Sequence, residues 1–399
     1  MPAENGIPFA RPLIGMEEEE AVLRVLRSGW LTTGRETLAF EKEFAAFLHS
    51  APAGSSGKPE PGDIYCLAVN SATAGLHLAL EACGVGPGDL VLVPSLTFTS
   101  TAEVALYLGA EAVFVDVLPG TFHMDPAALE ETLKGIPAGK AKAVIPVHYG
   151  GLPCNMGPIL EIARKYTLKV IEDAAHSFPS FSGNGFAGTV GDVGVFSFYA
   201  TKTITTGEGG MLVCRDSEIA KRVSVMRSHG IDRSVWNRYS DTGASWYYEV
   251  IEAGYKYNMP DLLAAVGRVQ LSRAWQLLRM RQEIAAVYDS AFSQDDRFLI
   301  PPSGEGDARH LYPLRLNAGR TAVSRNDFIE KLKVAGIGVS VHFIPLHTMP
   351  FYKSRYRLRE GDLPETMKSY SQEISLPLWP GMSGEQVTRV VEAVKNIAG

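Results

Sequence analysis

Cysteine is scarce in this sequence and forms no pattern. The 399 residues include four cysteines, and no two of them make a CxxC pair or a cluster with histidine. Such spacing argues against a disulfide framework and against the common zinc motifs. We therefore expect no metal, and we interpret the four residues as reduced core thiols: Cys66, Cys83, Cys154 and Cys214.

Long apolar runs and basic blocks are also missing. No stretch approaches about eighteen consecutive apolar residues, and residues 1–14 hold acidic residues and prolines where a signal peptide would have a positive start and an apolar core. We therefore expect a soluble, cytoplasmic protein without a membrane partner. The formal net charge of -6, with no run of lysine and arginine, argues against a nucleic-acid partner.

Apolar and charged residues are present in globular proportions, at 46% and 21%. From residue 63 onwards, apolar runs of strand length alternate with amphipathic stretches of helix length. We expect strands at 65–69, 90–93, 112–115, 143–147 and 169–171, and helices at 72–83, 99–108, 126–133 and 156–166. Continuous apolar strands joined by helices predict an α/β fold with a large, mostly parallel sheet covered on both faces.

A smaller α/β domain is expected towards the C-terminus. The segments that follow the large sheet are strands at 211–214, 312–316 and 339–343 and helices at 217–226, 325–335 and 384–397. Between them, an apolar stripe at helical spacing predicts one long helix from Leu262 to about Gln294. This helix links the two parts, so we predict a large domain of residues 1–270 and a small domain of residues 271–399.

Polar residues follow four of the expected strands, at the edge where ligands of parallel sheets bind. After the first strand, Asn70 and Ser71 lead into Ala72 and Thr73, which open a helix. Backbone N–H groups and the Thr73 hydroxyl could hold a phosphate there, although a simple N-cap is the alternative. After the second strand, Phe98 is a candidate to stack on an aromatic ligand, or merely to pack.

Two further strand ends carry groups that suit acid–base and carbonyl chemistry. Asp173 can hold a pyridinium proton, and His176 can donate to a nearby oxygen, although each could instead be a structural cap. Lys202 follows the apolar run 191–198. A poorly solvated lysine reaches its neutral amine more readily and forms an imine with a carbonyl, whereas most lysines are ordinary surface residues. A glycine-rich turn at 207–210 permits close approach and favours the chemical interpretation.

Taken in order, the motifs of this chain resemble those of the DegT-type nucleotide-sugar aminotransferases. These are pyridoxal-phosphate (PLP) enzymes of the aspartate-aminotransferase fold, also called fold type I. No single motif is specific, but the ordered set is, and it extends over nearly the whole chain. The motifs include Ser28-Gly29-Trp30, Ala72-Thr73-Ala74-Gly75-Leu76, Pro94-Ser95-Leu96-Thr97-Phe98, Glu172-Asp173-Ala174-Ala175-His176, Phe196-Ser197-Phe198, Lys202, Gly207-Glu208-Gly209-Gly210, Gly254-Tyr255-Lys256-Tyr257-Asn258-Met259 and Val341-His342-Phe343-Ile344-Pro345-Leu346-His347.

The resemblance implies a role for each matching residue. Lys202 would form the Schiff base with PLP and move the substrate proton, and Asp173 would pair with the pyridine nitrogen. The other implied cofactor contacts are His176 to the phenolic oxygen, Phe98 on the ring, and Ala72, Thr73 and Ser197 to the phosphate.

The family also forms homodimers with shared active sites. Residues around Lys256 and Asn258 would therefore reach the partner's cofactor, although many relatives have Asn where Lys256 stands.

The implied reaction is transfer of an amino group from L-glutamate to a nucleotide-linked ketosugar, a UDP- or dTDP-4-keto-hexose, in amino-sugar or surface polysaccharide biosynthesis. Relatives that deoxygenate sugars carry His in place of the lysine, so Lys202 favours transamination. Candidate substrate contacts are Arg238, Tyr239, His342 and His347, which could equally be exposed loop residues without a role. Alternatives are amination of a cyclitol ketone or related ring ketone, an aminobenzoate-forming dehydratase of the same fold, and a non-catalytic PLP-binding regulator.

Overall fold

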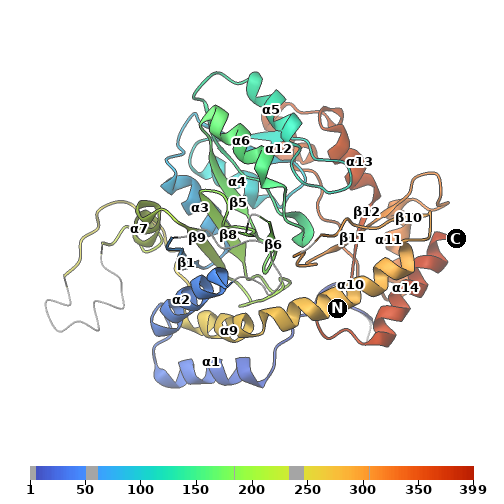
Figure 1. Cartoon of the computed structure of the whole chain (residues 1–399), viewed down its shortest axis with the longest axis horizontal. Coiled ribbons are helices and arrows are strands. Elements are labelled where there is room, and N and C mark those ends of the chain that lie inside the picture. Colours follow the sequence, from blue (N-terminus) through green and yellow to red (C-terminus); the bar gives the residue numbers. More distant parts are fainter. Residues whose placement is uncertain (1–5, 51–61, 184, 233–246, 305) are drawn as a thin grey trace.

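The computed structural model describes residues 6–50, 62–183, 185–232, 247–304 and 306–399. Among these residues a seven-stranded sheet forms the centre of the larger part of the molecule (Figure 1). Its strand order is β1-β9-β8-β5-β4-β2-β3. In the described part of the chain, no helix has the length and apolar character needed to cross a bilayer.

The sheet is parallel except at one strand. Its members are β1 (Tyr65–Val69), β2 (Leu90–Pro94), β3 (Glu111–Val115), β4 (Ala141–Val144), β5 (Lys169–Asp173), β8 (Val193–Ser197) and β9 (Gly210–Cys214). β9 runs antiparallel to both β1 and β8, whereas β8, β5, β4, β2 and β3 pair in parallel. β1 therefore points the same way as β8, and the carboxyl ends of β1, β2, β5 and β8 share one edge. The predicted mostly parallel sheet is confirmed.

Helices cover both faces of this sheet, which explains why its strands are apolar throughout. Leu67 of β1 packs on one face with α3 (Ala72–Ala82), α4 (Ser100–Tyr107) and α7 (Ser217–Met226). Cys66, the preceding residue, packs on the other face with α2 (Arg35–His49) and α9 (Asp261–Ser272). Farther along that second face lie α5 (Pro126–Lys134) and α6 (Met156–Tyr166), while α1 (Met16–Ser28) packs outside α9. The four cysteines are unpaired, as expected of reduced thiols.

The expected long helix from Leu262 to Gln294 is wrong as a single element. The chain forms α9 and then α10 (Ala274–Phe292), separated by Arg273, whose backbone leaves the helical region at φ -103 and ψ 3. α9 packs against α1 and α2, whereas α10 runs into the smaller core (Figure 1). No glycine or proline marks the break, so the sequence pattern could not reveal it.

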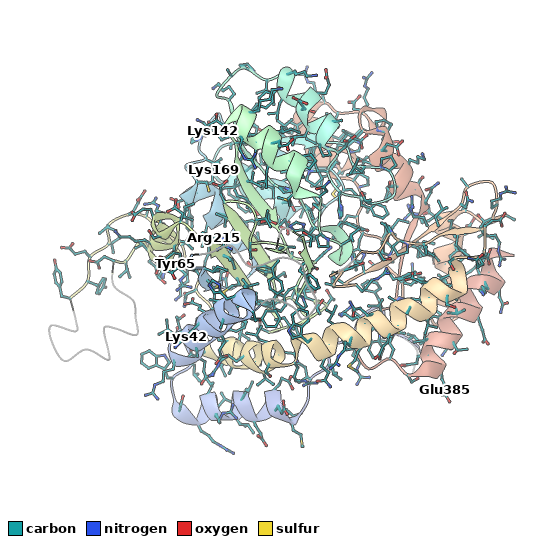
Figure 2. The ribbon with its side chains drawn as sticks, in the orientation of Figure 1. Lys42, Tyr65, Lys142, Lys169, Arg215 and Glu385 are labelled. Atoms are coloured by element: carbon teal, nitrogen blue, oxygen red, sulfur yellow. The ribbon has the colours of Figure 1, made fainter. Side chains whose placement is uncertain are left out.

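The smaller core is built on a three-stranded antiparallel sheet of β10 (Phe298–Leu299), β11 (Tyr312–Leu316) and β12 (Glu373–Leu376). Its helices are α10, α11 (Arg325–Val334) and α14 (Gly384–Ala398), with charged residues such as Glu385 on the outside (Figure 2). The described structure has no strand at 339–343, where one was expected. Ser340 alone bridges to Ser375, and the His342 N–H donates to the Glu373 side chain instead of a strand carbonyl.

The two cores exchange segments. Ile7, near the start of the chain, packs in the smaller core and pairs with Ile337, and the Trp379 indole N–H donates to the Pro8 carbonyl at 3.1 Å. In return, Tyr352 of α12 (Pro350–Tyr356) packs in the core of the large sheet. The division of the chain at residues 270 and 271 stays a prediction.

Candidate active site

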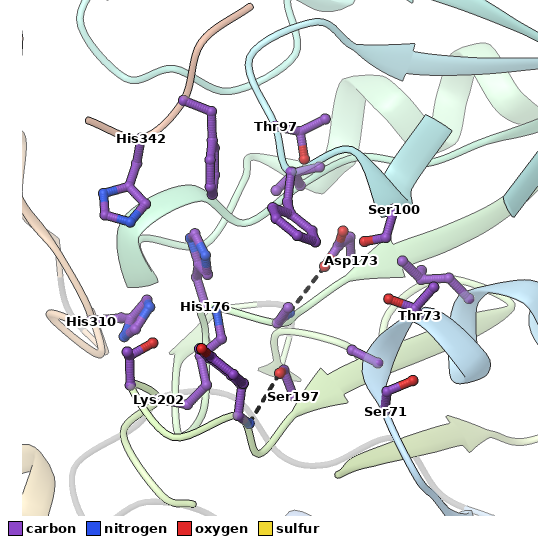
Figure 3. Close-up of a pocket in the computed structure, with 18 of the residues that line it drawn as sticks. Ser71, Thr73, Thr97, Ser100, Asp173, His176, Ser197, Lys202, His310 and His342 are labelled. Carbon is purple, nitrogen blue, oxygen red and sulfur yellow. Dashed lines mark hydrogen bonds between the residues drawn. The ribbon is translucent and has the colours of Figure 1, made fainter. Parts of the chain in front are cut away.

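The four strand ends singled out in the sequence meet at one cavity of about 580 Å³. Figure 3 shows Ser71 and Thr73 on one side of it, histidines on the other, and Asp173, Ser197 and Lys202 between them. The structure therefore brings together seven of the candidate cofactor contacts. They are Ala72, Thr73, Phe98, Asp173, His176, Ser197 and Lys202.

Lys202 lies in the turn that follows β8 and projects into the cavity. Its backbone N–H donates to the Tyr199 carbonyl at 2.9 Å, which fixes the turn. Burial lowers the pKa of Lys202 to about 8, opposed by the negative charge of Asp173 and assisted by the positive charge of Arg281. A neutral amine is therefore accessible near neutral pH, as nucleophilic and base chemistry requires.

Asp173 ends β5 and is buried at the floor of the cavity. The Thr101 hydroxyl donates to its Oδ2 atom at 2.9 Å, and the Ala175 N–H donates to Oδ1 at 3.1 Å. Burial raises the pKa of Asp173, while these two bonds and the charge of Lys202 oppose the rise. The carboxylate is thus held in one orientation, where a cationic group of a ligand would stabilise its ionised form.

The start of α3 offers unused backbone donors. Ser71 caps the helix by accepting from the Ala74 N–H at 3.1 Å, and no described residue accepts from the N–H groups of Ala72 and Thr73. Gly210 of β9 lies against this turn, where a Cβ would come within 2.8 Å of the Ala72 nitrogen. The capping role falls to Ser71, so the next two N–H groups are left to bind an anion.

Three histidines form the wall opposite α3 (Figure 3). The rings of His176 and His310 lie 4.6 Å apart, and those of His176 and His342 lie 6.4 Å apart. Burial and the nearby Lys202 charge lower the pKa of all three. The Gly150 N–H donates to His176 Nδ1 at 3.3 Å, so the ring proton sits on Nε2 and is free to donate.

Aromatic rings border the same space. Phe98 is 56% exposed, and its ring centroid lies 6.0 Å from that of Phe343. Phe9 from the start of the chain also lines the cavity. An exposed phenylalanine that borders a cavity has little packing role, so the stacking interpretation of Phe98 is the better one.

The other predicted site residues lie elsewhere. Lys256 and Asn258 lie beside the end of β1, outside the lining, and the Asn258 amide donates to Thr33 Oγ1 at 2.6 Å. His347 is buried rather than exposed, and its Nδ1 atom lies 2.7 Å from Ser95 Oγ. We therefore do not propose it as a substrate contact. Arg238 and Tyr239 lie outside the described residues.

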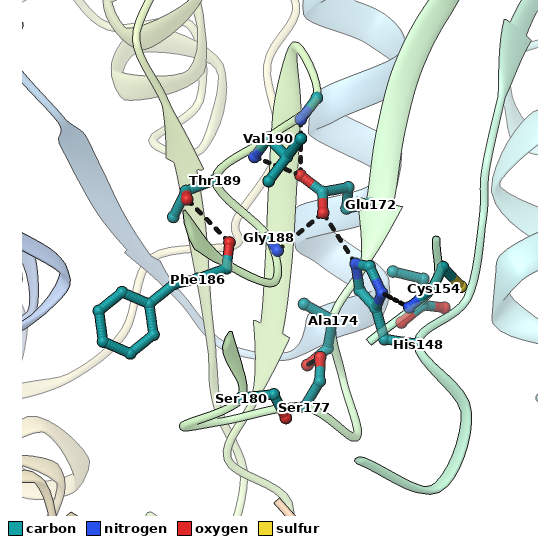
Figure 4. Close-up of polar contacts among 12 residues, drawn as sticks. His148, Cys154, Glu172, Ala174, Ser177, Ser180, Phe186, Gly188, Thr189 and Val190 are labelled. Carbon is teal, nitrogen blue, oxygen red and sulfur yellow. Dashed lines mark hydrogen bonds and ion pairs between the residues drawn. The ribbon is translucent and has the colours of Figure 1, made fainter. Parts of the chain in front are cut away.

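A buried polar cluster surrounds Glu172, the residue that precedes Asp173 in β5 (Figure 4). Glu172 accepts from the N–H groups of Gly188, Val190 and Gly191 at 2.9, 2.7 and 2.6 Å, and its Oε2 atom lies 2.8 Å from His148 Nε2. The Cys154 N–H donates to His148 Nδ1, so Nε2 carries the ring proton and donates it to Glu172. Burial alone would raise the pKa of Glu172, but His148 and the N–H groups hold it below its usual range.

Comparison with known proteins decides the family. The family model of the DegT/DnrJ/EryC1/StrS aminotransferases matches residues 12–395. The chain belongs to this family. It is 44% identical to the spore coat polysaccharide biosynthesis protein SpsC of Bacillus subtilis (strain 168) over 395 residues, which are 98% of this chain and 97% of SpsC.

Solved structures of sugar aminotransferases have the same fold. The PMP form of the putative sugar aminotransferase Spr1654 from Streptococcus pneumoniae has a TM-score of 0.87 and 31% identity, covering 98% of this chain and 99% of that one. Helicobacter pylori PseC, an aminotransferase involved in pseudoaminic acid biosynthesis, has a TM-score of 0.86 and 27% identity, covering 99% of each chain. The predicted fold type I and DegT-type membership are confirmed, and the protein is a PLP-dependent sugar aminotransferase.

The cavity of this DegT/DnrJ/EryC1/StrS aminotransferase fits PLP group by group. Unused N–H donors at α3 suit a phosphate, and Ser197 lines the cavity close to them, paired with Gly210 of β9. A buried carboxylate suits the ring nitrogen, and a lysine with a lowered pKa suits the aldehyde.

Sequence reasoning missed two residues of this site, Thr101 and His310. Thr101 sits inside an expected helix, one turn after Thr97, and the two hydroxyls lie 2.8 Å apart. Nothing local distinguishes it from a helix-forming residue. His310 precedes β11, and a histidine beside an expected strand of the smaller domain was its only signal.

Proposed function

We propose that this enzyme transfers the amino group of L-glutamate to a nucleotide-linked ketosugar, a UDP- or dTDP-4-keto-hexose, in amino-sugar or surface polysaccharide biosynthesis. The observation that carries the proposal is the wall beyond Lys202, where uncharged imidazoles stand beside the aromatic rings of Phe9, Phe98 and Phe343. No arginine is among the described residues of this lining. Neutral donors and acceptors beside ring faces suit the hydroxyls and ring of a sugar.

The residues of the cavity divide the work of this reaction. PLP, when bound, supplies an aldehyde that accepts amino groups and a ring that withdraws electrons from the attached carbon. Asp173 would hold the proton on the ring nitrogen, and the N–H groups of Ala72 and Thr73, with Ser197, would bind the phosphate. Lys202 Nζ takes the proton from the substrate carbon and returns it, because its lowered pKa allows both directions near neutral pH.

His176 and Phe98 orient the cofactor. The Nε2–H of His176 is the donor available for the phenolic oxygen, and its tautomer is set by the bond from Gly150. Phe98 would stack on the cofactor ring and exclude water from it.

We also propose a homodimer in which Lys256 and Asn258 approach the partner's cofactor. Both lie next to the end of β1, at the same sheet edge as the phosphate donors, yet outside the lining of their own cavity. The Asn258 Oδ1 atom is buried and has no hydrogen-bond partner among the described residues. In a homodimer, the partner's cofactor would be the group that these two side chains contact.

The test is the two half-reactions measured separately. Protein loaded with PLP is incubated with L-glutamate, and 2-oxoglutarate and the amine form of the cofactor are measured. UDP- and dTDP-linked 4-keto-hexoses are then added, and the aminated nucleotide sugar is identified by mass. We expect the amine form to be consumed only when a ketosugar is present.

Two results would overturn the proposal in different ways. Amination of a cyclitol ketone, with no turnover of any nucleotide sugar, would overturn the ketosugar proposal and support the ring-ketone alternative. A bound cofactor that glutamate fails to convert would exclude L-glutamate as donor and, if other amino acids also fail, would support the regulator alternative.

A further inference from the structure

Behind the cavity, three side chains of the smaller core form a hydrogen-bonded chain. His342 Nδ1 lies 2.8 Å from Ser375 Oγ, and the Ser375 hydroxyl donates in turn to Glu373 Oε1. The His342 backbone N–H donates to Glu373 Oε2 at 3.0 Å. Glu373 therefore contacts His342 twice, once through the backbone and once through Ser375. The imidazole and the peptide that carries it are both fixed against β12.

The position of Glu373 is unusual for a carboxyl group. It is 1% exposed, and its hydrogen-bond donors are the Ser375 hydroxyl and the His342 N–H. Burial raises its pKa to about 8, opposed by these two bonds and by the charge of Arg325. Burying a carboxyl group is costly, so a role beyond packing is expected for this one.

His342 is the end of the chain that meets a ligand. It lines the cavity beside His176 and His310, while its Nδ1 atom is engaged by Ser375. No described residue bonds to Nε2. The hydrogen-bonding character of Nε2 is therefore decided by Nδ1, because a neutral imidazole carries one proton on one nitrogen.

We propose that Ser375 and Glu373 are positioning residues that decide which ring nitrogen of His342 carries the proton, and thereby whether Nε2 accepts or donates a hydrogen bond to the sugar. The sugar as ligand rests on the function proposed above. The proposal that Ser375 and Glu373 set the tautomer of His342 does not depend on that function, since it follows from contacts within the protein.

The chain has two proton arrangements, and each is balanced. With Glu373 ionised, it accepts from Ser375, whose oxygen accepts from His342 Nδ1–H, and Nε2 offers a lone pair to a sugar hydroxyl. With one proton added to Glu373, the carboxyl donates to Ser375, which donates to Nδ1, and the ring proton moves to Nε2. The imidazole stays neutral in both, so a single proton on a buried carboxyl reverses the polarity of the cavity wall.

The other titratable groups around this chain leave the ring neutral. Burial and the charge of Lys202 lower the pKa of His342 to about 3, so the ring itself does not titrate near neutrality. The pKa of Lys202 is also lowered to about 8, so the Glu373→Gln variant is needed to assign a response near pH 8 to Glu373. The groups that face the chain from neighbouring elements are Tyr149, whose hydroxyl donates to the His342 carbonyl, His176, Lys202, His310 and Arg325.

The Glu373→Gln variant keeps the shape of the side chain but allows only one of the two proton arrangements. Its amide oxygen still accepts from the His342 N–H, while its NH₂ donates to Ser375, so the ring proton is held on Nε2 at every pH. Ser375→Ala breaks the chain and removes the constraint on Nδ1. Glu385→Gln is the matched control, because Glu385 is exposed on α14 (Figure 2) and does not line the cavity.

The direct readout is the tautomer of His342 in the PLP-loaded protein labelled with ¹³C,¹⁵N-histidine. The His342 signal is assigned by its loss in His342→Gln. In the unmodified protein we expect the ¹³Cδ2 shift to move between the two neutral tautomers as pH rises through about 8. In Glu373→Gln we expect no such movement, and in the control we expect the wild-type curve. A tautomer that ignores both pH and Glu373→Gln would overturn the proposal, whatever the enzyme aminates.

The second readout is the KM for the ketosugar. Well above pH 8, Glu373→Gln differs from the wild type in the polarity of Nε2, and we expect its KM to differ roughly 3- to 10-fold, the size of one hydrogen bond. Well below pH 8 both proteins carry the proton on Nε2, so the values should converge. A difference independent of pH would show a merely structural effect and overturn the proposal. If the wild type aminates no ketosugar, the proposed function fails and the NMR result still decides the tautomer.

Discussion

At the scale of single residues, Arg281 shapes the chemistry of Lys202 without lining the cavity. It is 2% exposed and donates to the carbonyls of Leu378 at 2.8 Å, His310 at 3.2 Å and Thr201 at 3.3 Å. No acidic residue in the described part of the chain pairs with it, and burial lowers the pKa of Arg281 to about 10. Its charge is therefore poorly compensated and acts on the amine of Lys202.

We expect Arg281→Met to raise the pKa of Lys202. In the wild type, covalent attachment of PLP should speed up as pH rises and level off above about 8, because the neutral amine is the reactive form. Removing the positive charge favours the ammonium ion, so the midpoint moves to higher pH. The visible absorbance of the attached cofactor measures the rate. Arg281→Lys keeps the charge and should keep the midpoint, and equal midpoints in all three proteins would contradict the argument.

Lys202→Ala should abolish covalent attachment and lower turnover by about 10² to 10⁴-fold or more, because one group supplies both functions. Mass spectrometry after borohydride reduction reports the attachment, and glutamate-dependent 2-oxoglutarate release reports turnover. Lys142→Ala is the matched control, since Lys142 is exposed on β4 (Figure 2). Borohydride-stable label at a lysine other than Lys202 would refute the assignment.

At the scale of elements, Glu172 joins β5 to the turn that enters β8. Those strands carry Asp173 and Lys202 at their ends, and the Glu172 bonds to residues 188–191 set how the strands are aligned. His148 adds a second tie, because its backbone N–H donates to the Asp173 carbonyl at 3.1 Å. Hydrogen bonds behind the cavity therefore fix the relative positions of the Asp173 carboxylate and the Lys202 amine.

Glu172→Gln should lower the free energy of unfolding by about 2 to 4 kcal/mol, because its NH₂ group must face N–H donors whichever way the amide is turned. Chemical denaturation measures the change, with Glu385→Gln as the control. The native pKa of Glu172 is depressed, so its contribution is present above its unfolded pKa and is lost as pH falls through the folded value. The gap between variant and wild type should therefore narrow in acid; a gap that widens in acid would contradict this account.

Element periodicity made most of this architecture predictable, and the failures have physical causes. Apolar runs and caps located β1, α3, α6 and α7 because burial and backbone hydrogen bonding are satisfied locally. The break at Arg273 depends on α9 and α10 packing against different cores, which no local pattern records. The sequence of residues 339–343 has the pattern of a strand. In the structure, however, the His342 N–H donates to the Glu373 carboxyl group and not to a neighbouring strand.

The site was predictable to the same extent. Residues that follow strands were found because parallel strands deliver them to one edge. Thr101, His310, Ser375 and Glu373 act through contacts between distant segments. Their roles are visible only once the chain is folded.

At the scale of the whole molecule, the proposed homodimer has a decisive test. If Asn258 serves the partner's site, a mixed dimer of Lys202→Ala with Lys256→Ala/Asn258→Ala contains one site with all defects and one intact site. Random mixing should then recover about a quarter of wild-type activity from two inactive proteins. Light scattering should give twice the mass of one chain. No recovery beyond either variant alone would show that the sites are not shared.

The start of the chain crosses the molecule to complete the cavity. Ile7 lies in the smaller core, the Pro8 carbonyl accepts a hydrogen bond from Trp379, and Phe9, the next residue, forms part of the cavity wall. For anyone who produces this protein, the practical consequence concerns truncation. A protein shortened past Phe9 would lose part of the cavity wall together with the contacts of Ile7 and Pro8 with the smaller core, so these residues should be kept.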